Sequence, residues 1–354
     1  MISKYSFLPI TTRLRSRFLG TAPIRSLATS KVELAPADEC PALPVISLRN
    51  EFDRVRRVAP LSTIEDQHEW ITCARTRHGP TLAYRFENAV LADHTVYVPG
   101  GYEVAKSGDK RAILPGKHEE YDEAQLCTYA ASNLFFGHWL RDALAMELLA
   151  EQRGLVALSY AKRPWIHEPG YREMVNLPGA PVSFASVRDL WIVDDRGLNK
   201  EWRGRFRELR TRVRRTASNG GPTHVFLSRG KSGAARELLN SASITDSLVN
   251  RGFSIVEPEM LSPFEIVHSL ASAKVVISVE GSALNHVQYA LPENSAIIAI
   301  QPPEQFNAFH KILADFNNLR FGYVVAAPAS EGSFVLEPER LLRTLDLVEA
   351  AVRG

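Results

Sequence analysis

Cysteine is scarce in this chain of 354 residues, which has only Cys40, Cys73 and Cys127. They are far apart and none forms a C-x-x-C pair, so neither a disulfide framework nor a zinc knuckle is indicated, and we expect reduced thiols. Long apolar runs are also missing, which argues against a membrane span. A hydrophobic content of 45% and a charged content of 23% predict a soluble protein with a substantial core.

Several cofactor and metal motifs are absent as well. The sequence contains no G-x-G-x-x-G and no G-x-x-x-x-G-K-[ST], which disfavours a nicotinamide cofactor and P-loop chemistry. Gly281-Ser282-Ala283 lacks the second glycine of a nucleophile elbow, which weakens a hydrolase interpretation. No D-x-D and no H-x-x-x-H occurs, so we expect no dedicated metal site and no cofactor.

Acidic residues are missing from the N-terminus up to Glu33, whereas basic residues are frequent there: Lys4, Arg13, Arg15, Arg17, Arg25 and Lys31. This composition resembles a transit peptide or a basic tail that touches anionic lipid. A frayed, cationic terminus is the alternative that we favour. We therefore expect a cytoplasmic protein with a flexible tail over residues 1–40, through which it could contact a membrane surface.

The first half of the chain gives irregular signals. Residues 36–60 contain four prolines and predict a loop. Leucines at helical spacing, followed by Gly154, predict a helix over 133–153, and a polar helix should cover 199–217. SNGGP at 218–222 is typical of a hinge. Strands are expected at 81–87, 90–98, 164–167 and 189–194.

After residue 224 apolar strands alternate with helices, which predicts an α/β fold with a parallel sheet. The expected strands are 224–227, 253–256, 275–279, 296–300 and 321–325, and the expected helices are 235–250, 262–273, 282–290, 307–316 and 337–353. Ser262, Pro263 and Glu265 form the start signal of the second helix, with an N-cap, a proline in the first turn and a capping box.

An arginine-rich run extends over 203–215, where Glu208 is the only acid. Such a run is usually a solvated helix face and less often contacts an anion or a membrane. Among the functions considered for this run, a nucleic-acid contact has the least support, because the net charge is only +2 and no RNA-binding motif is present.

Two strand-to-helix junctions carry polar residues that could bind a ligand. Ser228 to Arg236 follow one expected strand, and Glu280, Gly281 and Ser282 follow another. Ligands of open parallel sheets gather beyond the carboxyl ends of the strands, and a helix start with a nearby arginine suits a phosphate or diphosphate. Strand-to-helix turns also use glycine and serine simply to turn the chain, so for either junction alone both interpretations stay open.

Four blocks of the sequence, taken in order, resemble glycosyltransferase family 61, whose bacterial members are often called capsular polysaccharide biosynthesis proteins. They are YAASNLFFGHWLRDAL (129–144), VFLSRGKSGAARELLN (225–240), RGFSIVEPEMLSPFEIVHSLASAKVVIS (251–278) and EGSALNHVQYALPENSAIIAIQPP (280–303). The resemblance extends in pattern over roughly residues 85–325. It implies an inverting transferase that moves a sugar from a nucleoside-diphosphate donor to a hydroxyl of a glycan, polysaccharide or glycolipid, usually without a metal.

The resemblance also implies a GT-B fold, in which two Rossmann-like domains face each other across a cleft. We accordingly expect an acceptor-side domain over 41–217, a nucleotide-sugar-binding domain over 218–330 and a C-terminal helix over 331–354. In the absence of D-x-D, positive side chains and a helix start would have to neutralise the leaving diphosphate.

Donor-binding roles follow from the matching positions. Arg229 matches the arginine that we expect at the diphosphate, and Arg236 matches a second arginine, although a surface ion pair would explain Arg236 equally well. Glu259 could accept a ribose hydroxyl or could be a solvated loop acid. Backbone N–H groups of the glycine turn, at Gly281, Ser282 and Asn285, are expected to reach a phosphate or the nucleoside.

The transfer also needs a base for the acceptor hydroxyl. His138 and Asp142 share a helix face, so Asp142 could orient His138 or act as the base itself. Alternatively, His138 and Trp139 form an aromatic helix start packed against the core. Glu280 is a third candidate for acid or base work.

The sequence departs from the family pattern near Ile266, where many relatives have glutamine, at Glu280, where many have histidine, and at Ser241, where many have glutamate. The last two departures bear on the site. These departures motivate an alternative of another class, a catalytically inactive scaffold or nucleotide-sugar-binding protein of a polysaccharide assembly system.

Overall fold

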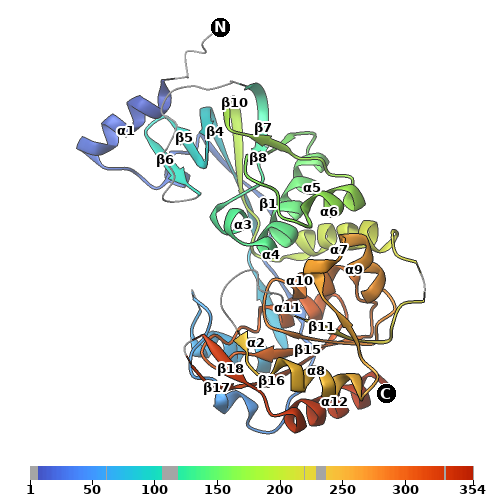
Figure 1. The fold of residues 1–354 in the computed structure, drawn as a ribbon. Helices are drawn as coiled ribbons and strands as arrows, with labels where there is room; N and C mark the ends of the chain where they lie inside the picture. Colours follow the sequence, from blue (N-terminus) through green and yellow to red (C-terminus); the bar gives the residue numbers. More distant parts are fainter. Residues whose placement is uncertain are drawn as a thin grey trace. The chain divides into compact units, whose positions relative to one another are not determined.

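The computed structural model describes residues 7–60, 62–105, 119–218, 220–228, 237–330 and 332–353. Within it the chain forms two compact units (Figure 1). Unit 1 contains residues 1–38 and 78–209, and unit 2 contains residues 39–77 and 210–354. Residues 41–77, which were expected in the acceptor-side domain over 41–217, therefore pack in the second unit. Mixed α/β structure is present in both units, as expected.

A mixed sheet forms the centre of unit 1, with strand order β6-β5-β4-β10-β7-β8-β9 and β1 paired to β4. Antiparallel pairing joins β6, β5, β4 and β10, whereas β10, β7, β8 and β9 are parallel. Only this second half therefore has the pairing of a Rossmann-like sheet. The bounds are β1 Ser30–Ala35, β4 Thr81–Ala92, β5 Thr95–Val98, β6 Gly101–Val104, β7 Glu119–Leu126, β8 Val156–Tyr160, β9 Ala180–Val182 and β10 Phe184–Asp194.

The N-terminal residues form part of unit 1. Residues 8–35, which the sequence analysis places in a flexible tail, contain α1 (Leu8–Leu19), a 3₁₀ turn (Ile24–Leu27) and β1. Leu8 packs against Val90 and Tyr97 on one face of the sheet, while Ile24 packs against Phe86 on the other. Among the described residues, no helix is long and apolar enough to cross a membrane.

The helix expected over 133–153 is interrupted in the structure. It consists of α3 (Ala130–Leu134), a short α4 (Phe136–His138), a π-helical turn (Trp139–Ala143) and α5 (Leu144–Gln152). Phe135 separates the first two with extended backbone angles, φ −131° and ψ 125°. The periodicity of the leucines reports which face is buried and does not register such a break, so the prediction of one continuous helix is wrong.

The strand expected at 164–167 is also wrong. These residues form a turn before α6 (Glu168–Val175), in which the Glu168 carboxylate accepts the backbone N–H of Trp165 at 3.2 Å and the Glu168 N–H donates to the Trp165 carbonyl at 2.9 Å. The Glu168 carboxylate therefore satisfies a backbone N–H group before the helix, so this group needs no hydrogen-bond partner from a neighbouring strand.

Unit 2 is built on a fully parallel sheet of order β13-β11-β14-β15-β16. In chain order this is the doubly wound arrangement 2-1-3-4-5, whose ligand-binding switch point lies between the first and third strands, here β11 and β14. All five strands were expected from the sequence. Their bounds are β11 His224–Leu227, β13 Ser254–Val256, β14 Val275–Val279, β15 Ala296–Gln301 and β16 Arg320–Val325.

Helices cover both faces of this sheet, with α8 and α12 on one face and α9, α10 and α11 on the other (Figure 1). Their bounds are α8 Ser241–Val249, α9 Pro263–Leu270, α10 Leu284–Ala290, α11 Phe309–Phe316 and α12 Pro338–Arg353. The capping box between Ser262 and Glu265 is confirmed. The helix expected from residue 235 begins only at Ser241, because residues 237–238 form β12, which pairs with β18 (Ser333–Val335) next to β17 (Ala327–Pro328).

Residues 39–77 attach to the β15–β16 side of unit 2. They contain a 3₁₀ turn (Glu51–Arg54) and α2 (Ile64–Thr72), while β2 (Asp38–Pro41) and β3 (Arg75–His78) pair at their ends. Isolated bridges join Ile46 to Gly322 and Val58 to Phe306. The buried Glu51 carboxylate accepts the Val325 N–H at 2.7 Å.

The arginine-rich run forms most of α7 (Lys200–Arg214), and the expectation of a solvated face is wrong for several of its members. Arg203 pairs with Asp38 at 2.6 Å, and Arg205 pairs with Asp195 at 2.6 Å. Both arginines are buried. A charge pattern alone could not show this, because the paired acids lie in other parts of the chain.

Candidate active site

In unit 1, three polar side chains gather around His138. Its Nδ1 lies 2.9 Å from Asp142 Oδ2, 2.9 Å from the Tyr129 hydroxyl and 2.8 Å from a terminal nitrogen of Arg141. Asp142 also accepts from Arg141 Nε at 2.5 Å and from the Tyr129 hydroxyl at 2.5 Å. The imidazole is thus held on its Nδ1 side, while 38% of the side chain stays exposed.

The Asp142 carboxylate is buried, and its charge is balanced inside this cluster. Burial alone would raise its pKa, but the Arg141 charge and the hydrogen bonds from His138 and Arg141 outweigh burial and lower the pKa of Asp142 well below its usual range. Burial, followed by the Asp142 charge, raises the pKa of Tyr129. Asp142 is therefore a stable anion and a poor proton acceptor, which suits an orienting role.

Local backbone structure places these groups together. His138 ends α4 and the π-helical turn follows directly, so that Arg141 and Asp142 lie within reach of one imidazole. Single π-turns inside helices occur frequently at functional sites. Trp139 anchors the turn, since it is only 1% exposed and the Arg172 guanidinium lies 5.3 Å from its ring. The core-packing alternative therefore describes Trp139, but not the half-exposed His138.

Sequence reasoning missed two members of this cluster, Tyr129 and Arg141. Arg141 stands three residues after His138, a spacing that places both on one helix face, so this signal was available. Tyr129 lies before α3, and only the break in the helix at Phe135 brings its hydroxyl back to His138.

In unit 2, polar residues that were expected to bind the donor lie at the carboxyl edge of the parallel sheet. Glu259 is half-buried just after β13, and Glu280, Gly281 and Ser282 follow β14. The strand between them is β11, which is tied to β14 by a hydrogen bond of 2.9 Å from Ser278 Oγ to the Leu227 carbonyl. Arg229 and Arg236 follow β11 but lie outside the described residues.

The conformation of the turn after β14 is fixed by one glycine and by hydrogen bonds. Gly281 has φ +151°, which side chains rarely tolerate, and its carbonyl accepts the Leu284 N–H at 3.1 Å. The Asn285 amide donates to the Ser282 carbonyl at 3.1 Å, and Asn285 is 3% exposed. Helix α10 therefore begins only at Leu284, two residues later than the sequence predicts, and residues 281–283 form the turn.

Glu280 occupies an interior position at this edge. It is 2% exposed, its N–H donates to the Ile300 carbonyl at 2.9 Å, and its Oε1 lies 3.9 Å from His310 Nε2. Such burial suits a structural or electrostatic role better than direct proton exchange with an acceptor. Among the described residues, no group of three histidine, cysteine or acidic side chains is placed to hold a metal ion.

The far end of α10 is fixed by the arginine-rich helix. Arg210 donates to the Gln288 carbonyl at 2.7 Å and to the Leu291 carbonyl, and Arg214 donates to the Ala290 carbonyl. Burial, followed by the charge of Arg214, lowers the pKa of Arg210 to about 10. These guanidinium groups satisfy carbonyls at the C-terminal end of the helix.

Residues 136–298 match a family model described as Glycosyltransferase 61. This region belongs to glycosyltransferase family 61. The match indicates a glycosyltransferase. The matched region includes His138, Arg141 and Asp142, whereas Tyr129 precedes it, and it also includes the strands β11 to β14 with their junctions.

Other comparisons add little to the family assignment. No curated protein matches the chain significantly. Among solved structures, a flavodoxin-like domain from Synechococcus is 17% identical and is similar over 37% of this chain and 99% of its own length, with a TM-score of 0.27. A TM-score this low does not show a shared fold.

Proposed function

We propose that this glycosyltransferase transfers a sugar, with inversion and without a metal, from a nucleoside-diphosphate donor to a hydroxyl of a glycan, polysaccharide or glycolipid. The observation that carries the proposal is the match of residues 136–298 to the family, because that region includes both a half-exposed histidine paired with a buried aspartate and the switch point of a parallel sheet. The GT-B arrangement that the resemblance implies stays part of the proposal.

His138 is the proposed base. If Nδ1–H donates to Asp142, then Nε2 carries the lone pair and can take the acceptor proton. The acceptor oxygen then forms a bond to the anomeric carbon as the bond from that carbon to the diphosphate breaks, and the nucleoside diphosphate leaves. Asp142 holds the tautomer and balances the positive charge that develops on the ring, which is the role its lowered pKa supports.

The donor is proposed to bind at the carboxyl edge of unit 2. There Gly281 and Ser282, after β14, allow the donor to approach the backbone closely. Glu259 follows β13, and β11 is the one strand between β13 and β14. Arg229, directly after β11, is the proposed diphosphate contact, with Arg236 as a second cation. The guanidinium groups would stabilise the leaving group in place of a metal.

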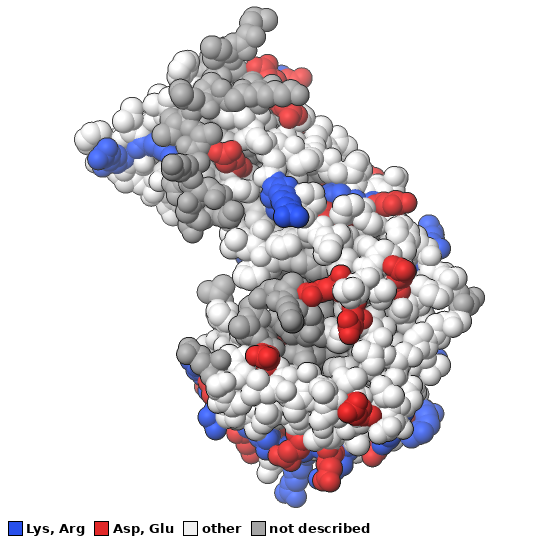
Figure 2. Space-filling model, in the orientation of Figure 1, with Lys and Arg blue, Asp and Glu red and all other residues white. Residues whose placement is uncertain are grey.

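We also propose a membrane contact through α1. Phe7, Leu14 and Phe18 are exposed, and at 3.6 residues per turn they fall within an arc of about 40°. Arg15 and Arg17 are exposed about 80° to either side of the centre of that arc, and Figure 2 shows basic side chains over α1. An apolar stripe flanked by arginines suits the surface of a membrane with anionic lipids.

A donor screen tests the enzymatic proposal. Purified protein is incubated with a panel of nucleotide sugars and glycan acceptors, products are identified by mass spectrometry, and nucleoside-diphosphate binding is titrated in parallel. We expect turnover of at least one donor, and micromolar to millimolar nucleotide binding that Arg229→Ala abolishes. Nucleotide binding without turnover of any donor would favour the scaffold alternative, and equal affinity in Arg229→Ala would remove Arg229 from the site.

A further inference from the structure

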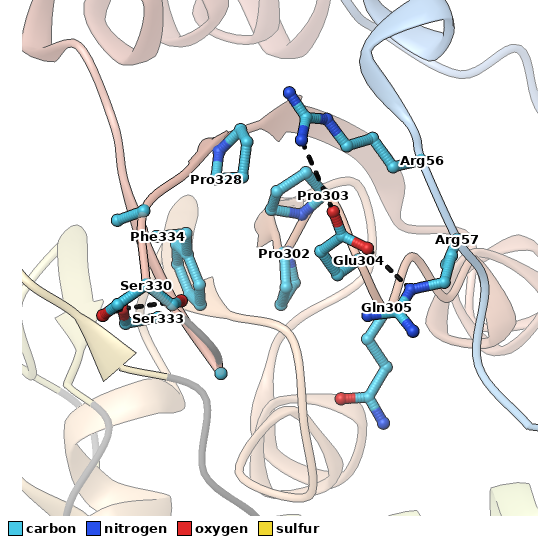
Figure 3. Close-up of a pocket in the computed structure, with 12 residues that line it drawn as sticks. Arg56, Arg57, Pro302, Pro303, Glu304, Gln305, Pro328, Ser330, Ser333 and Phe334 are labelled. Carbon is cyan, nitrogen blue, oxygen red and sulfur yellow. Dashed lines mark hydrogen bonds and ion pairs between the residues drawn. The ribbon is translucent and has the colours of Figure 1, made fainter.

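A pocket of about 520 Å³ opens at the carboxyl edge of the unit 2 sheet, beyond β15 and β16 (Figure 3). Pro302 to Gln305 follow β15 directly, and Pro328 to Ser330 follow β16 through β17. Arg56 and Arg57 complete the lining from the segment 39–77. None of these residues belongs to the donor site proposed after β11, β13 and β14.

The two arginines are carried by a firmly held backbone. The N–H groups of Arg56 and Arg57 donate to the Pro303 carbonyl at 2.8 and 3.1 Å, and the Phe306 N–H donates to the Arg57 carbonyl at 3.0 Å. Just before them, Arg54 Nε donates to the Val325 carbonyl at 3.2 Å. The pocket wall therefore exists before any ligand binds, which reduces the entropy that binding would cost.

The charge of the described lining is unbalanced. One carboxylate, Glu304, serves both guanidinium groups, at 2.6 Å from Arg57 Nε and 3.7 Å from Arg56. The arginine side chains are 61% and 75% exposed, so these ion pairs are weak and can be exchanged at little cost. Each guanidinium keeps further N–H donors that suit a carboxylate or a phosphate.

The rest of the pocket suits a sugar ring. Pro302, Pro303 and Pro328 supply apolar surfaces, and Figure 3 shows Ser330 and Ser333 across the pocket from Arg57. The two serine hydroxyls lie 2.7 Å apart, and Ser333 Oγ also donates to the Ser330 carbonyl at 3.0 Å. Their protons are thus engaged while oxygen lone pairs remain to accept from hydroxyls of a ligand. Apolar surfaces with a few polar groups are typical of ligand sites.

We propose that this pocket binds an acidic saccharide unit, one that carries a carboxylate or phosphate, of a glycan. The anion lies at Arg56 and Arg57, the ring lies against the prolines, and hydroxyls donate to the serine oxygens. The inference goes beyond the transfer reaction, since it needs neither His138 nor the donor junction, and a failure of the proposed chemistry would leave it intact.

Calorimetric titration of the full-length protein tests this proposal, with a glucuronate-containing disaccharide, its neutral glucose counterpart, glucose 6-phosphate and uridine diphosphate as probes. We expect both acidic sugars to bind at least tenfold more tightly than the neutral one, with a difference that shrinks as ionic strength rises. Arg56→Ala combined with Arg57→Ala should remove the preference, and Glu304→Gln should increase it.

The chain offers a matched control for the double variant. Arg75 and Arg77, in the same segment, also share one carboxylate, with Glu39 at 3.2 and 3.1 Å, but they do not line the pocket. Arg75→Ala combined with Arg77→Ala should leave the preference unchanged. Equal binding of acidic and neutral sugars, equal loss in both double variants, or competition by uridine diphosphate for the same arginines would overturn the proposal.

Discussion

The contacts of His138 define what each residue of its cluster can contribute. Only the imidazole is substantially exposed, whereas Asp142 and Arg141 are buried and neutralise each other's charge. A buried acid that is paired in this way keeps its charge at all physiological pH values. The cluster therefore separates the group that exchanges protons from the groups that orient it.

Substitution of His138 should remove catalysis and spare donor binding. We expect His138→Gln to lower kcat by about 10²–10⁴-fold, the usual contribution of a general base, with an unchanged nucleotide Kd. Asp142→Asn should lower kcat as well, because the amide cannot stabilise the imidazolium. His68→Gln on the exposed side of α2 serves as the control. Full activity of both cluster variants in a steady-state assay would show that the base lies elsewhere.

The buried arginines of α7 should matter for stability. Arg205→Ala leaves the Asp195 carboxylate buried without its partner, and burial already raises the pKa of Asp195 despite Arg205. We expect a loss of about 3–5 kcal/mol in the free energy of unfolding, measured with urea. Lys200→Ala, at an exposed position on the same helix, should change it by less than about 0.5 kcal/mol. Similar effects in both variants would contradict the pairing.

At the scale of elements, the sequence predicts unit 2 well and unit 1 poorly. Apolar strands such as 275–279 and 296–300 are buried on both faces, so a continuous apolar run suffices to identify them. In unit 1, β7 begins with EEYDE and its first residues are mostly exposed, so it carries no comparable signal. The candidate site was likewise predictable only in part. Spacing pairs His138 with Asp142, whereas Tyr129 joins them only through the break at Phe135.

Helix α1 should bring the protein to anionic membranes. Phe18→Asp places a charge on the apolar stripe, so we expect at least a tenfold loss of binding to phosphatidylserine vesicles in a sedimentation assay, and little binding of the wild type to neutral vesicles. Leu347→Asp is the matched control, since Leu347 is an exposed leucine on α12. Unchanged sedimentation of Phe18→Asp would exclude α1 as the contact.

Helix α11 carries a buried pair, Lys311 and Asp315, with a distance of 2.7 Å. Burial raises the pKa of Asp315 to about 6, against the opposing effect of Lys311. The folded state therefore binds a proton that the unfolded state has lost between about pH 4 and pH 6, so stability should fall as pH rises through this window.

Asp315→Asn should abolish that pH dependence. We expect the free energy of unfolding of the wild type, relative to this variant, to decrease by up to about 3 kcal/mol between pH 4 and pH 7 in urea titrations. A constant difference across that range would show that Asp315 does not titrate there.

At the scale of the whole molecule, unit 2 depends on a segment that is remote in sequence. Phe52 packs against Phe306 with ring centroids 5.3 Å apart, and Leu43 donates its N–H to the Asp315 carboxylate at 3.1 Å. A fragment of residues 210–354 lacks these contacts. We expect it to unfold at lower urea concentration than the same fragment joined to residues 39–77 by a flexible linker. Equal midpoints would mean that the segment adds nothing to the fold.

Unit 2 is formed by two separate stretches of the chain, so its parts are synthesised at different times. Residues 39–77 leave the ribosome long before β16, and at about 5–20 residues per second their partners follow on the order of 10–50 s later. During this interval Phe52 and its neighbours lack their packing partners and expose apolar surface. We therefore expect chaperones to bind the nascent chain until its C-terminal portion has been translated.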